Sequence, residues 1–401
     1  MEPMSFHLSS SASIGGKAVP FGLYLHLPFC LSKCAYCDFD SLPLEAAGGL
    51  DAALRYLDAI NIELDLRAAS SEFHDAPVAT IFLGGGTPTI LPPERLAALL
   101  ARIRARFPIA PDAEITVEAN PGTVDQAKIT ALLEAGVNRF SLGVQSFNDS
   151  VLRTLGRAHT AAQAAQAIAD LRAAGCANLN LDLIYCIPHQ SLADWQDTLR
   201  QALAAQPEHI SAYGLSVEEG TPLAADIASG RLPDPDEELY AEMYDTAAET
   251  LLAAGYQHYE ISNFARPGLH CLHNRRYWAN AEYLGLGASA HSYRCGLRWN
   301  NLQDPAIYTE WLSRGILPVA RAEALSAERR LGETLMLGLR CAEGVVEEQV
   351  AADCGLAPRE VFEKEIQLLC DQGLLIAENG ALRIPREKWL ISNEALAHFV
   401  V

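Results

Sequence analysis

The sequence has few positive charges for its length, and this deficit argues against one large class of partners. Its 401 residues include 30 lysines and arginines against 50 aspartates and glutamates, a formal net charge of −20. An acidic surface repels phosphate backbones, so we expect no nucleic-acid partner. The sequence also lacks an apolar run of about 18 residues, so we expect no transmembrane helix.

A secretory signal and a disulfide framework are missing as well. Residues 1–20 are rich in Ser, Gly and Ala but lack a basic start followed by an apolar run, so we predict a disordered tail. Of the ten cysteines, seven are scattered singly along the chain, unlike the dense pairs of a small secreted domain. These features predict a reducing, cytoplasmic location.

The sequence does contain a regular alternation of short β-type runs and Ala- and Leu-rich helical stretches up to about residue 215. Six such repeats predict a parallel sheet whose helices cover the outer face. We therefore predict an α/β fold, with a partial or full β/α barrel as first choice and a doubly wound open sheet as the alternative. The β-type runs are 23–27, 80–83, 114–117, 139–143, 178–184 and 209–215, and the clearest helical stretches are 93–106, 124–135, 161–174 and 192–204.

The pattern changes in the last third of the chain. An aromatic, His-rich stretch extends to about Asn301, and from Ser326 short helices precede two β-type runs around Asn379-Gly380. This order predicts a winged-helix-like α+β domain. Residues 326–401 hold eight Lys and Arg against thirteen Asp and Glu, so we do not expect DNA binding. The predicted division is a tail (1–20), a barrel core with its extension (21–301) and a C-terminal domain (302–401).

Three cysteines form a compact group directly after the first predicted strand. Cys30, Cys34 and Cys37 have the spacing Cys-x3-Cys-x2-Cys. Three thiolates on one loop can hold three irons of a 4Fe-4S cubane cluster. The fourth iron would then be open to a small molecule such as S-adenosylmethionine (SAM), whose amino and carboxylate groups can chelate iron. A structural zinc site with a distant fourth ligand is the alternative.

Distinctive residues also end or follow the other predicted strands. The glycine turn Gly84-Gly85-Gly86-Thr87-Pro88 ends the second strand, and glycines let backbone groups approach a ligand closely. Glu118 ends the third strand, Gln145 follows the fourth and Asp182 lies within the fifth. In a β/α barrel the loops after the strands share one rim, where active sites lie. We therefore expect these residues to meet.

The first motif also carries a family resemblance. The stretch Tyr24-Leu-His-Leu-Pro-Phe-Cys30-x3-Cys34-x-Tyr-Cys37-Asp-Phe39 resembles the radical SAM superfamily, and more narrowly the relatives of the oxygen-independent coproporphyrinogen III oxidase. The resemblance extends over nearly the whole chain and implies a partial (β/α) barrel of the radical SAM type, a 4Fe-4S cluster and SAM. The positions that match SAM-contacting residues of the superfamily are Tyr24, Gly85, Gly86, Thr87, Glu118, Gln145, Arg157 and Asp182.

Two of these side chains have an obvious chemical use in such a site. A carboxylate such as Glu118 can accept hydrogen bonds from ribose hydroxyls. The Arg157 guanidinium can pair with the methionine carboxylate of SAM. In the superfamily the glycine turn contacts the methionine end of the ligand.

Two activities occur among the relatives, and one position separates them here. The oxidase pattern has a fourth cysteine two residues after the third, where this chain has Phe39. The pattern His273-Asn-x-x-Tyr277-Trp278 and the stretch after it are instead similar to a haem chaperone branch, whose members bind haem and transfer it to recipient haemoproteins. The resemblance therefore implies a haem chaperone. The alternative is a coproporphyrinogen dehydrogenase or another porphyrin-modifying radical SAM enzyme.

Haem binding needs an axial ligand and partners for the propionates. Histidine is a common axial ligand, so we predict His273, with Cys271 and His291 as alternatives. Arg275 and Arg276 could pair with the propionates. The implied partners are recipient haemoproteins, peripheral membrane association through those recipients, and a small electron donor of the flavodoxin or ferredoxin type.

Overall fold

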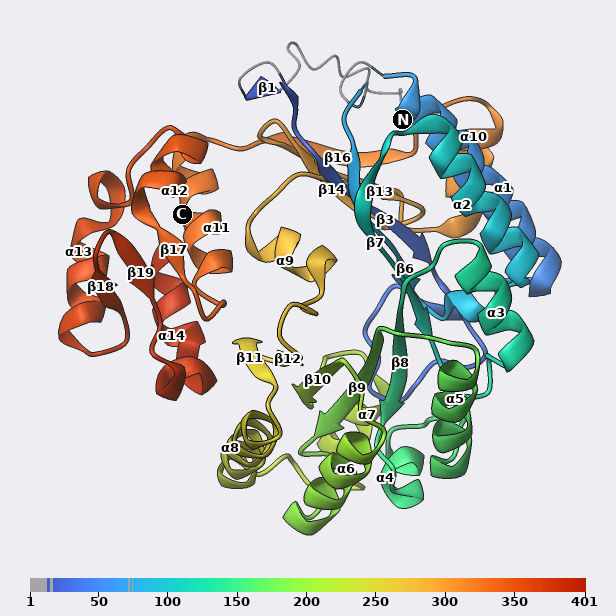
Figure 1. The fold of residues 1–401 in the computed structure, drawn as a ribbon, viewed down its shortest axis with the longest axis horizontal. Coiled ribbons are helices and arrows are strands. Elements are labelled where there is room, and N and C mark those ends of the chain that lie inside the picture. The colour runs from blue at the N-terminus through green and yellow to red at the C-terminus, as the bar shows by residue number, and fades with distance from the viewer. Residues whose placement is uncertain (1–12, 15–16, 71–72, 74) are drawn as a thin grey trace.

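A single large sheet organises most of the chain (Figure 1). The computed structural model describes residues 13–14, 17–70, 73 and 75–401. Six parallel strands lie side by side in chain order, each paired with the next along the sequence. They are β3 (Phe21–Leu27), β6 (Val78–Gly85), β7 (Ile109–Ala119), β8 (Arg139–Gln145), β9 (Leu179–Tyr185) and β10 (His209–Gly214).

The connecting helices lie along one side of this curved sheet (Figure 1). This arrangement confirms the partial β/α barrel and rules out the doubly wound alternative, in which helices would cover both faces. The helices are α1 (Gly49–Ala68), α2 (Pro93–Arg106), α3 (Gln126–Glu134), α4 (Asp149–Thr154), α5 (Ala161–Ala173) and α6 (Leu192–Ala204). The bounds predicted for α2 and α6 match the structure. At α6 the reason is a capping box, in which Ser191 Oγ accepts from the Asp194 amide and Asp194 accepts from the Ser191 amide.

In strand β3, alternate side chains point to opposite faces of the sheet, one facing the hydrophobic core and the other facing the pockets. Leu23, Leu25 and Leu27 are fully buried in the hydrophobic core, each contributing roughly 1.5–3 kcal/mol. Tyr24 and His26 alternate with them, and so project to the other, concave face of the sheet. The same alternation in the other strands leaves polar side chains on the concave face.

Short strands extend the sheet at both edges. On one side β13 (Tyr283–Leu286) pairs in parallel with β3, followed by antiparallel β14 (His291–Arg294), β15 (Leu297–Asn301) and β16 (Val319–Ala324). On the other side lie β12 (Asn263–Ala265) and β11 (Gln257–Glu260). Because β16 pairs with β15, the predicted domain boundary between 301 and 302 falls inside this sheet.

The C-terminal residues form the predicted winged-helix-like domain. Its sheet has the order β17 (Val345–Val346), β19 (Ala381–Arg383), β18 (Ile376–Glu378), and its helices are α11 (Ala327–Gly338), α12 (Glu347–Cys354) and α13 (Pro358–Asp371). Asn379 and Gly380 both have positive φ, as a two-residue hairpin turn between β18 and β19 requires.

The remaining elements are short or peripheral. Most of the predicted tail lies outside the described residues, and Ser13–Ile14 (β1) pairs with Lys17–Ala18 (β2). No described helix is long and apolar enough to cross a membrane. The other elements are β4 (Phe29–Cys30), β5 (Leu42–Pro43), η1 (Pro88–Ile90), α7 (Pro222–Ala228), α8 (Glu237–Ala253), α9 (Leu272–Trp278), α10 (Pro305–Ser313), η2 (Arg386–Ile391), α14 (Ser392–Leu396) and η3 (Ala397–Phe399).

A buried carboxylate on α1 fastens the added strands to the barrel. The side chain of Glu63 is fully buried, and Oε2 accepts hydrogen bonds from the Gly287 amide (3.0 Å) and the Tyr308 hydroxyl (2.7 Å). Its Oε1 accepts one from Asn301 Nδ2 (2.8 Å). Glu63 therefore joins α1 to α10, to β15 and to the turn between β13 and β14.

Replacing Glu63 by alanine should destabilise the fold strongly, because three buried donors would lose their acceptor. We expect the free energy of unfolding to fall by about 3 kcal/mol or more. Urea denaturation followed by tryptophan fluorescence measures this change. The exposed Glu328 on α11 provides the control, and its alanine variant should change stability by under about 1 kcal/mol. Equal stability of the two variants would contradict this role of Glu63.

Candidate functional site

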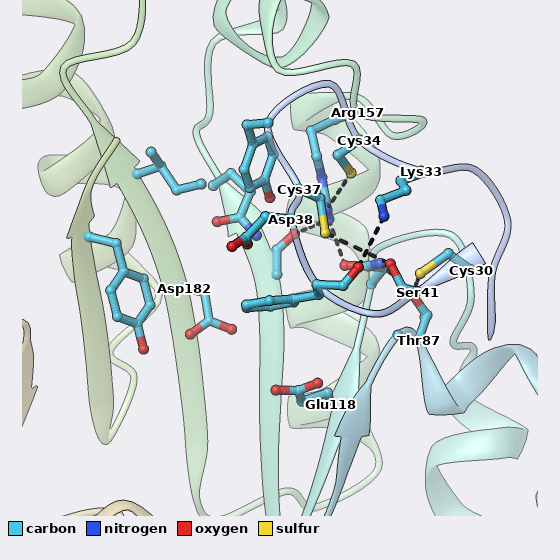
Figure 2. Close-up of a pocket in the computed structure, with 18 of the residues that line it drawn as sticks. Cys30, Lys33, Cys34, Cys37, Asp38, Ser41, Thr87, Glu118, Arg157 and Asp182 are labelled. Carbon is cyan, nitrogen blue, oxygen red and sulfur yellow. Dashed lines mark hydrogen bonds between the residues drawn. The ribbon is translucent and has the colours of Figure 1, made fainter. Parts of the chain in front are cut away.

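A pocket of about 400 Å³ opens at the carboxyl ends of the parallel strands (Figure 2). We call it the first pocket. It brings together ten of the twelve residues predicted from the sequence, because the loops after adjacent parallel strands emerge on the same side of a sheet. These ten are Cys30, Cys34, Cys37, Gly85, Gly86, Thr87, Glu118, Gln145, Arg157 and Asp182.

Each of the three cysteines has a polar partner within hydrogen-bonding distance of its sulfur (Figure 2). Thr87 Oγ1 donates to Cys30 Sγ (3.6 Å) and Arg157 Nη1 donates to Cys34 Sγ (3.4 Å). Ser41 Oγ lies 3.8 Å from Cys37 Sγ. Such contacts stabilise negative charge on sulfur and orient it. These contacts oppose the effect of burial, which raises the pKa of the Cys30 and Cys37 thiols.

This donor set fits a 4Fe-4S cluster better than a single zinc ion. The first pocket is lined by neither a fourth cysteine nor a histidine. Among the described residues, no three His, Cys, Asp or Glu side chains converge closely enough to hold one metal ion. A cubane cluster distributes its ligands over different irons, so three separated sulfurs would hold three of its irons and leave the fourth without a protein ligand.

Thr87 and Arg157 also connect the cysteine loop to two strands. Asn120, which follows β7, donates from Nδ2 to Thr87 Oγ1 (2.7 Å). Arg157 Nη2 donates to Asn120 Oδ1 (2.6 Å) and to the Gly143 carbonyl on β8 (2.7 Å). The arginine Nε is buried without a partner in the described structure. The sequence analysis missed Asn120 and Ser41, although Asn120 stands two residues after Glu118.

The glycine turn is packed closely against its neighbours, so side chains at Gly84 or Gly86 would clash with them. A Cβ at Gly86 would lie 2.7 Å from the carbonyl oxygens of Leu27 and Phe29, and one at Gly84 would lie 2.8 Å from Glu118 Oε2. Gly85 has φ +96°, which favours glycine. Because Phe29 precedes Cys30, a side chain at Gly86 would displace the cysteine loop.

Two partly buried carboxylates, Glu118 and Asp182, line the pocket and carry raised pKa values. Burial, together with the nearby Asp182 charge, raises the pKa of Glu118 to about 8, although the Gly85 amide donates to its Oε2 at 3.1 Å. Burial also raises the pKa of Asp182, against hydrogen bonds from Ser141 Oγ (2.9 Å) and Asn180 Nδ2 (2.8 Å). A cationic ligand would stabilise the ionised carboxylates and so lower both pKa values.

Gln145 shows backbone strain at the rim. Its φ is +64°, uncommon for a residue with a side chain, and the pairing of β8 with β9 shifts register between Gly143 and Gln145. Strain of this kind costs about 1–3 kcal/mol and concentrates at functional sites. In this protein the strained residue, Gln145, is the last residue of β8 and lines the first pocket.

Tyr24 lies next to the first pocket, in a neighbouring pocket of about 370 Å³ that we call the second pocket. Gly85, Glu118 and Phe39 line both pockets, so the two are contiguous. His291, an alternative in the sequence analysis, is exposed and also lines the second pocket.

His273, in contrast, is not placed to bind haem iron. It is 1% exposed, and both ring nitrogens have partners: Nδ1 lies 2.8 Å from Thr80 Oγ1 and Nε2 lies 3.1 Å from the Tyr277 hydroxyl. Cys271 is also buried, with its sulfur 3.6 Å from Glu114. The sequence could not distinguish a buried histidine from an accessible one.

The two predicted propionate partners also lie elsewhere. Arg275 pairs with Glu343 (3.3 Å), and Arg276 donates to the carbonyls of Pro20 (2.6 Å) and Glu282 (3.1 Å). Neither arginine lines the first or the second pocket.

Comparisons with known proteins agree with this geometry. Residues 24–202 match the Radical SAM superfamily, and residues 325–391 match the HemN C-terminal domain. The fold is similar to that of coproporphyrinogen III oxidase (HemN) from Escherichia coli, a radical SAM enzyme, with a TM-score of 0.82 and 24% identity over 95% of this chain and 90% of that one. The fold and the three-cysteine loop define a radical SAM protein.

Curated relatives narrow this class. Heme chaperone HemW of Mycobacterium tuberculosis is 42% identical over 86% of each chain, and HemW of Bacillus subtilis is 34% identical over 94% of this chain and 98% of the relative. A mitochondrial radical S-adenosyl methionine domain-containing protein 1 of Bos taurus is 35% identical over 90% of this chain and 83% of the relative. The chain belongs to the HemW family, and this membership implies a 4Fe-4S cluster and SAM.

We expect Cys30, Cys34 and Cys37 each to be required for the cluster, because each would ligate one iron. Single serine variants, reconstituted anaerobically, should lose the 4Fe-4S absorption and electron paramagnetic resonance signals. Cys370→Ser on α13 is the matched control and should retain full iron and sulfide content, as should variants of the other scattered cysteines. A complete cluster in Cys34→Ser would refute the assignment.

SAM binding should release a proton below about pH 8. Burial and the nearby Asp182 charge raise the pKa of Glu118 to about 8, so before SAM binds it is mainly protonated at neutral pH. The sulfonium cation favours the ionised carboxylate and lowers that pKa, so affinity should rise by at most about tenfold per pH unit as the pH increases towards 8, then level off.

Isothermal titration calorimetry in buffers of different ionisation enthalpy measures this release. Glu118→Gln should bind SAM more weakly and release less proton, with the cluster still present. Unchanged proton release in Glu118→Gln would show that another group titrates.

Proposed function

We propose that this protein binds haem and transfers it to recipient haemoproteins, with a 4Fe-4S cluster and SAM in the first pocket. The observation that carries the proposal is the similarity of nearly the whole chain to relatives named heme chaperone HemW. The two contiguous pockets support it, since one suits the cluster and SAM and the other leaves room for a second ligand.

In this proposal the first pocket is the site of the cluster and SAM. Cys30, Cys34 and Cys37 would hold three irons of the cluster, and the remaining iron would be available to bind SAM. The bound pair would supply one-electron chemistry. The protein binds and orients the ligand, with Arg157 near the methionine carboxylate and Glu118 near the ribose. The other proposed contacts come from Tyr24, Gly85, Gly86, Thr87, Gln145 and Asp182.

The fold similarity to the E. coli oxidase favours a second candidate, a coproporphyrinogen dehydrogenase or another porphyrin-modifying enzyme. Phe39 argues against the dehydrogenase. It stands where the oxidase pattern has a cysteine, its side chain is 65% exposed, and it lies at the border of the two pockets. An apolar ring at this border offers a packing surface in place of a thiol.

The partners follow from the same proposal. Recipient haemoproteins are part of it. A flavodoxin- or ferredoxin-type electron donor, membrane association through recipients and a cytoplasmic location remain predictions from the sequence.

A transfer experiment tests the function directly. Cluster-loaded protein titrated with haem should bind it and then pass it to an apo-haemoprotein, whose own absorption spectrum and activity report its arrival. The same preparation, given SAM, reductant and coproporphyrinogen, should form no protoporphyrinogen. Formation of protoporphyrinogen would favour the dehydrogenase, and absence of both haem binding and turnover would contradict both candidates.

A further inference from the structure

The lining of the second pocket suits a flat aromatic ligand. Four aromatic rings line it, from Tyr24, Phe39, Tyr277 and Tyr283, together with two imidazoles. One is that of His291, and the other is that of His26, whose two ring nitrogens lie 3.0 Å from the Tyr24 hydroxyl and 2.9 Å from the Asp40 carbonyl oxygen. Aromatic rings offer large apolar surface and stack well on conjugated faces. Since Phe39 is strongly exposed, one side of the pocket reaches the surface. A planar ligand could thus enter without unfolding any element.

His291 can reach a ligand there. It opens β14 and is exposed, and no side-chain hydrogen bond within the described residues occupies its ring nitrogens, in contrast to His273. Burial and then the Arg298 charge lower its pKa, with Asp40 opposing. An imidazole whose ring nitrogens are not engaged by other side chains can bind a metal.

The His-Asn-x-x-Tyr-Trp motif contributes to this pocket through its tyrosine. Tyr277 lines the pocket, and its hydroxyl is 3.1 Å from His273 Nε2. The other His273 nitrogen lies 2.8 Å from Thr80 Oγ1 on β6, and its ring stacks on Phe82 with centroids 5.1 Å apart. His273 is thus a positioning residue: it does not line the pocket itself, but it contacts the hydroxyl of Tyr277, which does.

The charge of the second pocket indicates how a porphyrin would be oriented in it. Asp40 lines it, so the propionates of a porphyrin would be repelled from the interior and face solvent. Asp40 is held by Gln303 Nε2 at 2.6 Å and interacts electrostatically with His291.

We propose that haem occupies the second pocket with its ring against Tyr277, Tyr283 and Phe39, and that His291 is the axial ligand of its iron. The assignment rests on the proposed haem-binding function. It places haem directly beside the SAM pocket, since Phe39, Gly85 and Glu118 belong to both.

Resonance Raman spectroscopy of the ferrous haem complex tests the ligand, because the Fe–His stretching band does not overlap a signal from the cluster protein alone. In full-length, cluster-loaded protein, His291→Ala should lose this band and bind haem at least about tenfold more weakly. His291→Gly with added imidazole should regain the band. His398→Ala, a surface histidine of the C-terminal domain, is the matched control and should behave as the parent protein.

His273→Ala separates the two histidines. It should weaken haem binding through Tyr277 and still show the Fe–His band. Loss of the band in His273→Ala with retention in His291→Ala would overturn the assignment. Parent-like haem binding in all variants would overturn the site and leave the proposed function intact, whereas failure of the parent protein to bind haem would contradict the function itself.

Discussion

The close contact between the glycine turn after β6 and the backbone of residues 27–29 positions everything else in the site. Gly86 has no room for a side chain there, and the Thr87 amide donates to the Phe29 carbonyl at 2.8 Å. Cys30 follows at once, so the cysteine loop begins from a point held by β6. From there a chain of hydrogen bonds runs through Thr87, Asn120 and Arg157 to Cys34. The sulfurs are thus oriented by residues that are distant in sequence.

In the first pocket, the ionised forms of two acidic side chains are unfavourable until a cationic ligand binds. Two partly buried carboxylates, Glu118 and Asp182, interact electrostatically, and the pKa of Glu118 rises to about 8 because desolvation and the Asp182 charge disfavour its ionised form. Two carboxylates in such a position do not stabilise the fold, because the cost of removing them from water is not repaid. A cationic ligand makes the charges favourable, and this explains why the acidic residues lie on the concave face, whereas the leucines of β3 face the core.

The second pocket changes the interpretation of the histidine motif. His273 stood out in the sequence as the haem ligand, yet its ring is buried between Thr80 and Tyr277. The motif supplies Tyr277 to the pocket wall, and the accessible imidazole comes from β14, which Glu63 and the turn at Gly287 hold against the barrel. The residues of a sequence motif can therefore position the wall of a binding site, while the residue that contacts the ligand lies elsewhere in the chain.

The sequence by itself determined the alternating β-α repeats, two helices to the residue, the hairpin at Asn379-Gly380, the cysteine triplet and ten of the pocket residues. These features depend on local patterns: periodicity, caps, turn residues, and the rule that loops after parallel strands share a rim. Tertiary structure alone decided that β16 joins the barrel sheet, that Gly86 packs on Phe29, and that His291 is accessible whereas His273 is not. Each of these depends on contacts between segments far apart in the chain, and burial of a particular side chain is set only when those segments pack.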